Sequence, residues 1–256
     1  MDEVMRLLIM ARSNRPAAER LLEKSPECLS WHSSSNNTAL HLACWFGYRD
    51  VVEFLLERGA ELEARNLAEE TPLAVACSRG RPETVDLLLG WGADPTVLDR
   101  QQRSLLHLAC GAGCAATARR LLAAGLKVDA RDDLGFTPLF HALQVVSPHF
   151  ATISRSWAEQ QLAGASPPAI DYPREQERRL EVLTVLLEAG ADLEHVGACD
   201  QRPLHRAAEV ADLCPELALL LLSRGADPSC RDSNGDRAVD RLPPGAVAVR
   251  AAFGTT

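Results

Sequence analysis

The stretch Asn37-Thr38-Ala39-Leu40-His41-Leu42-Ala43-Cys44 returns twice in closely related form along the chain. The copies run over 70–77 and 103–110, and a shorter Thr-Pro-Leu start appears again at 137–139. The opening Thr or Ser residues are spaced by 33 residues each time. A fixed period of this length is typical of a small structural unit that is stacked on copies of itself. The sequence therefore predicts a repeat protein.

A second landmark, a Leu-Leu pair followed by a Gly, accompanies these motifs. The interval from the opening Thr or Ser to this Gly is 21 residues for Thr38, Thr71 and Ser104. A Thr hydroxyl can cap a helix, Pro suits the first helical position, and Gly tolerates the left-handed conformation that ends a helix. Each unit is therefore predicted to hold two short helices, with the remaining residues forming a hairpin finger.

A 33-residue unit that opens on Thr-Pro-Leu-His resembles the ankyrin repeat. The resemblance implies an all-α solenoid of helix-turn-helix units with β-hairpin fingers, about six to seven repeats including the caps. Because neither helix buries its apolar face alone, the core is expected to form only between stacked repeats.

The landmarks divide the chain into five segments. They are an N-terminal capping repeat (1–32), three regular ankyrin repeats (33–132), a repeat with an insertion (133–198), one further repeat (199–231) and a truncated C-terminal capping repeat (232–256).

The insertion is expected at about 147–178, because the interval from Thr137 to Gly190 is 53 residues instead of 21. The two helices of this repeat are then expected over 139–146 and 180–188. A loop of this length is either functional or disordered.

Phe150, Ile153 and Trp157 follow a helical spacing within the insertion. This spacing favours a docked amphipathic turn that contacts a partner. A degenerate extra repeat is another interpretation, but the insertion lacks the repeat motif.

Composition and charge limit the classes of function. The chain has 256 residues, 46% of them hydrophobic, and a formal net charge of −8. This charge argues against broad nucleic-acid binding, although Arg65, Arg131 and Arg231 share one repeat position and could form a local basic patch. The sequence shows no apolar run long enough to cross a membrane and no secretion signal. A soluble monomer in the cytoplasm or nucleus is expected.

The cysteines and histidines follow the repeat period. Cys44, Cys77 and Cys110 are 33 residues apart, which favours a buried core position over a zinc or disulfide site. The resemblance implies that His41, His107 and His205, at the His position of the motif, hydrogen-bond the backbone and tie adjacent fingers. No catalytic or phosphate-binding motif appears, so we expect no enzyme activity, no metal and no cofactor.

The resemblance also implies a concave binding surface, made of finger tips and the exposed face of the first helices. The finger positions are Ser34, Ser35, Asn37, Leu67, Ala68, Glu70, Arg100, Gln101, Arg103, Asp133, Leu134 and Phe136. The helix positions are Trp45, Phe46, Ser78, Arg79, Gly111, Ala112, Gln144 and Val145.

Trp45 and Phe46 are adjacent aromatics at a position where other repeats carry small or polar residues. Binding hot spots favour such residues, but the pair could also close a gap against the N-terminal cap. The predicted partner-binding residues are Trp45, Phe46, Leu67, Ser78, Arg79, Arg100, Arg103, Leu134, Phe136 and Trp157.

The expected function is a non-enzymatic scaffold or adaptor for a protein partner. One alternative is the substrate-recognition subunit of a ubiquitin ligase, or a fragment of one. The inserted late repeat is similar to ankyrin repeat and suppressor-of-cytokine-signalling (SOCS) box proteins, although 247–256 shows no such box. Another is an inhibitor that occludes an enzyme or transcription factor.

Overall fold

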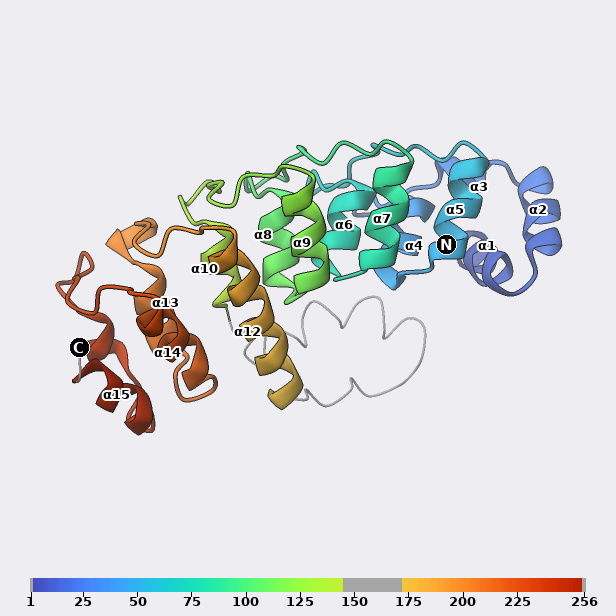
Figure 1. The fold of residues 1–256 in the computed structure, drawn as a ribbon. Helices are drawn as coiled ribbons and strands as arrows, with labels where there is room; N and C mark the ends of the chain where they lie inside the picture. Colours follow the sequence, from blue (N-terminus) through green and yellow to red (C-terminus); the bar gives the residue numbers. More distant parts are fainter. Residues whose placement is uncertain (1, 145–171, 255–256) are drawn as a thin grey trace. The chain divides into compact units, whose positions relative to one another are not determined.

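The computed structural model describes residues 2–144 and 172–254, which contain the helices labelled in Figure 1. The chain divides into two compact units, Met1–Leu134 and Gly135–Thr256. Both are built from short helices joined by loops, so the expected all-α ankyrin-type architecture is confirmed. No helix within the described ranges is long and apolar enough to span a bilayer.

The first unit holds two rows of helices that pack in register (Figure 1). In the inner row α4 contacts α6 and α6 contacts α8, and in the outer row α5 contacts α7 and α7 contacts α9. The N-terminal cap covers one end of both rows, because α1 packs on α4 and α5. The elements are α1 (Asp2–Ser13), α2 (Arg15–Lys24), α3 (Glu27–Ser30), α4 (Ala39–Phe46), α5 (Arg49–Glu57), α6 (Pro72–Ser78), α7 (Pro82–Gly90), α8 (Leu105–Gly111) and α9 (Ala115–Ala123).

The second unit repeats the paired arrangement with less regular elements. Its helix α10 contacts α12 and α13, while α14 packs on α12, α13 and α15. The elements are α10 (Pro138–Ala142), α12 (Tyr172–Glu188), η1 (Ala198–Asp200), α13 (Pro203–Glu209), α14 (Pro215–Ser223), η2 (Ala238–Arg241) and α15 (Val247–Phe253).

Two helix boundaries around the insertion differ from the sequence prediction. The first helix ends at Ala142 instead of 146, and the second begins at Tyr172 instead of 180. The last part of the predicted insertion is therefore helix, because the charged run before Leu180 continues the helical pattern and places Arg179 in the core. The remaining insertion residues, Trp157 among them, lie outside the described residues.

Where the motif carries a histidine, as at His41 and His205, its ring accepts a hydrogen bond from the N-cap N–H and also bonds the backbone of the next finger. The Thr38 hydroxyl accepts a hydrogen bond from the His41 N–H at 3.3 Å, and His41 Nδ1 accepts one from the Thr38 N–H at 3.2 Å. His41 Nε2 donates to the Glu70 carbonyl at 3.0 Å, and His205 Nε2 donates to that of Asp236 at 3.1 Å. The backbone role expected for these two histidines is confirmed. Burial lowers the pKa of His41.

All eight cysteines are free thiols. Cys44, Cys77 and Cys110 are fully buried in the core of the first unit, as their 33-residue spacing predicted. Burial raises the pKa of Cys44 and Cys77 well above the usual range, so both thiols stay protonated at neutral pH.

Candidate functional site

In the first unit, a short polar side chain at the base of a finger folds the loop. Asn66 Oδ1 accepts hydrogen bonds from the N–H groups of Ala68 and Glu70, at 2.9 and 3.0 Å. Asp99 Oδ1 does the same for Gln101 and Arg103 in the next finger, at 3.0 and 2.9 Å. Such side chains satisfy main-chain donors that would otherwise need a strand partner. Consequently the expected β-hairpins are reduced to single bridges, such as those of His32 with Thr38 and Leu98 with Ser104.

Neighbouring fingers are joined by one backbone hydrogen bond each. The N–H of Leu67 donates to the carbonyl of Ser35, that of Arg100 to Ala68, and that of Asp133 to Gln101, all at 3.0 Å. Because these bonds recur in the same register, the tips of the fingers in the first unit form one continuous edge.

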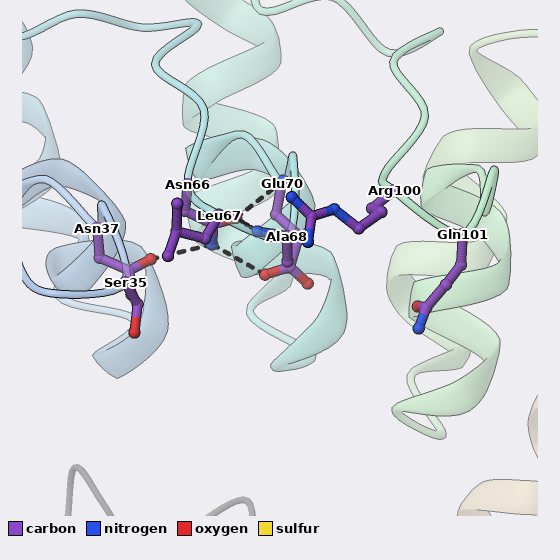
Figure 2. Close-up of a pocket in the computed structure, with 8 residues that line it drawn as sticks. All are labelled: Ser35, Asn37, Asn66, Leu67, Ala68, Glu70, Arg100 and Gln101. Atoms are coloured by element: carbon purple, nitrogen blue, oxygen red, sulfur yellow. Dashed lines mark hydrogen bonds between the residues drawn. The ribbon is translucent and has the colours of Figure 1, made fainter.

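A hollow of about 470 Å³ opens along this edge (Figure 2), and we call it the finger groove. Asn66 lines the finger groove, and its Nδ2 donates to Asn37 Oδ1 and Glu70 Oε2, each at 3.0 Å. Figure 2 shows Arg100 extending from its own finger towards Glu70. The lining residues are Ser35, Asn37, Asn66, Leu67, Ala68, Glu70, Arg100 and Gln101.

The finger groove offers several groups that have no partner of their own. Leu67 is 57% exposed. Within the described part of the chain, no ion pair or side-chain hydrogen bond is formed by Arg100 or Gln101. An exposed leucine, a free guanidinium and a free amide suit a peptide segment, since the amide can pair with a main chain and the guanidinium with a carboxylate.

Trp45 and Arg79, predicted from adjacent repeats, meet on the inner helices. The Arg79 guanidinium carbon lies 3.1 Å from the centroid of the Trp45 ring, and Arg81 Nε donates to the Trp45 carbonyl at 3.3 Å. Stacking of this kind holds the guanidinium plane in a fixed orientation. The pair is half-buried, so part of it faces solvent.

Phe46 packs on Tyr48, which in turn contacts the N-terminal cap. Its ring stacks on that of Tyr48 with centroids 5.3 Å apart, and the Arg12 guanidinium of α1 lies 4.6 Å from the Tyr48 centroid. This contact favours the alternative in which the aromatic residue closes a gap against the cap.

Three more of the predicted partner-binding residues have internal contacts. Arg103 pairs with buried Asp99 at 2.6 Å, and the Ser78 hydroxyl donates to the Val75 carbonyl at 3.0 Å. In the second unit Phe136 packs on Phe140, with centroids 4.9 Å apart. These contacts stabilise the fold, and they leave the side chains less available to a partner.

Leu134 is 61% exposed at the end of the first unit. Trp157 lies outside the described residues. Of the predicted residues, the structure places Leu67 and Arg100 in the finger groove, and Trp45 and Arg79 in a half-buried pair.

Asn66 was missed at the sequence level. Ser33, Asp99 and Asp132 are short polar residues at the same repeat position as Asn66, and this recurrence was the available signal. Only the hydrogen bonds show that the position forms the base of a finger. Across residues 2–144 and 172–254, no cluster of three or more His, Cys, Asp or Glu side chains could hold a metal ion.

Comparison with known proteins agrees with this architecture. A family model described as ankyrin repeats (3 copies) matches residues 3–66 and 73–149, more than half of the chain. Among solved structures, the crystal structure of the human ASB11 ankyrin repeat domain matches with a TM-score of 0.73 and 25% sequence identity. That match covers 97% of this chain and 96% of the other. No curated protein sequence matches the chain.

Proposed function

Because the chain belongs to the ankyrin repeat family, a family of protein-interaction modules, we propose that it is a scaffold or adaptor that binds a protein segment along the finger groove. The observation that carries the proposal is the free guanidinium of Arg100 beside exposed Leu67 in one hollow. We assign the chain no catalytic role and no nucleic-acid partner. Eight free thiols support a reducing compartment, the cytoplasm or nucleus.

Rigidity of the finger groove supports tight binding. The hydrogen bonds between fingers and the Asn66 contacts fix the main chain before a partner arrives. A partner therefore meets a surface that loses little conformational freedom on binding, which removes one of the main costs of association. The Trp45–Arg79 pair adds a rigid aromatic and cationic contact on the adjoining inner helices.

The test is quantitative affinity capture from cells, followed by mass spectrometry. We expect the double change Leu67→Ala and Arg100→Ala to lower recovery of the specific partners about tenfold, the effect of losing roughly 1.4 kcal/mol of binding free energy. Ile9→Ala is the matched control, because Ile9 in α1 is also 57% exposed but lies away from the finger groove. Equal recovery with the double variant and the wild type would exclude the finger groove.

The similarity to the human ASB11 ankyrin repeat domain favours a second candidate function. The chain would then recognise substrates for a ubiquitin ligase, using the same finger groove. Cullin or elongin subunits among the proteins captured with the wild-type chain would support this role, and their absence would count against it. An inhibitor of an enzyme or transcription factor would also use the groove, and it would reduce its partner's activity in a direct assay.

A further inference from the structure

A second hollow, of about 340 Å³, lies on the outer helices of the first unit, and we call it the Trp91 hollow. Its lining residues come from α7 and from the start of α5, two helices that pack side by side (Figure 1). Trp91 is 44% exposed, so a large part of its indole ring is available for contact. The hollow is lined by Arg49, Asp86, Leu87, Gly90 and Trp91, none of which lines the finger groove.

Gly90 keeps this hollow open, although the fold has no evident need for a glycine there. It is the last residue of α7, its φ is not positive, and a Cβ built on it would meet no atom within 4 Å. Glycine weakens a helix relative to alanine, so its presence carries a cost in stability. Other second helices carry a side chain at the equivalent position, as Glu57, Ala123, Glu188 and Ser223. The missing side chain leaves room beside the Trp91 ring.

The charge around the Trp91 hollow is negative. Glu83 lies one helical turn before Leu87 on α7, and Glu53 lies one turn after Arg49 on α5, so both share a face with lining residues. Neither carboxylate forms an ion pair among the residues that the structure describes, while Asp86 pairs with Arg120 at 2.5 Å. The charged groups placed around the hollow are the carboxylates of Glu53, Glu83 and Asp86 and the guanidinium groups of Arg49 and Arg120.

We propose that the Trp91 hollow is a docking site for a basic protein segment, which places a Lys or Arg side chain over Gly90 and against the Trp91 ring. The face of an indole ring attracts cations, and the excess of carboxylates complements a positive segment. Charge complementarity therefore distinguishes this occupant from an acidic one. The site uses none of the residues that line the finger groove, so evidence against binding at one site leaves the proposal for the other site intact.

The test uses the full chain and two 12-residue peptides, one of alternating Lys and Ala and the other of alternating Glu and Ala. Fluorescence anisotropy of labelled peptide measures affinity, and NMR of the ¹⁵N-labelled protein follows the Gly90 amide and the Trp91 indole. We expect the Lys peptide to bind and to shift both signals. Gly90→Ala and Trp91→Ala should each weaken binding about tenfold, whereas Leu213→Ala, a change at a similarly exposed apolar residue that lines neither hollow, should leave it unchanged.

Gly90→Ala is the decisive variant, because it changes no charge and alanine favours the helix, so the protein is expected to stay folded. A thermal melt checks this point. Equal affinity of the wild type, Gly90→Ala and Trp91→Ala for the Lys peptide would overturn the proposal, since binding would then reflect only the overall negative charge. Tighter binding of the Glu peptide, or no binding of the Lys peptide, would also overturn it. So would self-association that Trp91→Ala abolishes, because a second copy would then cover the hollow.

Discussion

The guanidinium of Arg179 lies 3.4 Å from the carbonyl oxygen of Ala142 at the end of α10. In the three regular repeats the equivalent carbonyls, of Ala43, Ala76 and Ala109, accept a backbone N–H from the tight turn that follows the helix. Arg179 therefore supplies a donor to this carbonyl from α12.

That turn contains a glycine in each regular repeat, and the sequence has none at the equivalent place of the repeat that holds α10. Gly47, Gly80 and Gly113 occupy its left-handed position in the regular repeats, with φ between 59° and 72°. Val146 stands at the equivalent place, and a β-branched residue disfavours that conformation. Arg179 is buried and also pairs with Glu175 at 2.8 Å.

Arg179→Leu is expected to destabilise the second unit by about 2–3 kcal/mol, because it removes the donor to the buried Ala142 carbonyl and the shorter of the two arginine contacts of Glu175. Arg179 is 2% exposed, so water cannot readily replace it. Urea unfolding monitored by circular dichroism measures the change in the free energy of unfolding. Arg178→Leu is the control, and since Arg178 is exposed it should cost less than about 0.5 kcal/mol. Similar losses for both variants would contradict the assigned role.

Glu69→Gly is expected to stabilise the first unit by about 0.5–1 kcal/mol. Glu69 is exposed at the tip of a finger and has φ of 60°, a conformation that costs an L-residue about 1–2 kcal/mol and glycine very little. The equivalent position of a later finger is Gly135, with φ of 77°. Glu53→Gly, the same change inside α5, should instead destabilise by about 1 kcal/mol. The measurement is the urea midpoint, and a loss of stability in both variants would refute the prediction.

The contribution of His41 to stability is expected to fall in acid. Its pKa is lowered in the folded state, while the unfolded value is about 6.5, so below that pH the unfolded chain binds a proton that the folded chain rejects. Stability from neutral His41 is thus complete above about pH 7 and is lost as the pH drops through 6.5. His41→Gln should cost less stability at pH 5.5 than at pH 7.5 in thermal melts. The same cost at both values would show that the imidazole does not titrate as proposed.

Thiol labelling should separate the cysteines by burial. Cys199 is exposed, whereas burial raises the pKa of Cys214 to about 11 and that of Cys44 and Cys77 further. Because the thiolate is the reactive form, iodoacetamide at pH 8 should modify Cys199 first in the folded protein. Peptide mapping by mass spectrometry identifies the labelled sites, and labelling in urea should reach all eight. Early labelling of Cys44 in the folded state would contradict the buried position.

The repeat period predicted most of the fold because the caps and turns that define each repeat are formed by residues close in sequence. Thr38 and Thr71 cap their helices as the motif implied, and Gly59 and Gly92 follow the second helices in the left-handed conformation. The resemblance to ankyrin repeats had placed seven of the eight residues that line the finger groove among the finger positions. These features depend on residues near in sequence, so the sequence alone determined them.

Tertiary structure decided which side chains remain available to a partner. The sequence gives Arg79, Arg100 and Arg103 equal charge, yet Arg79 stacks on Trp45, Arg103 pairs with Asp99, and Arg100 stays open to the groove. Arg179 likewise acquired its role only from neighbours on another helix. Such roles depend on distance, burial and competition among partners after the helices pack, and repeat spacing carries none of that information.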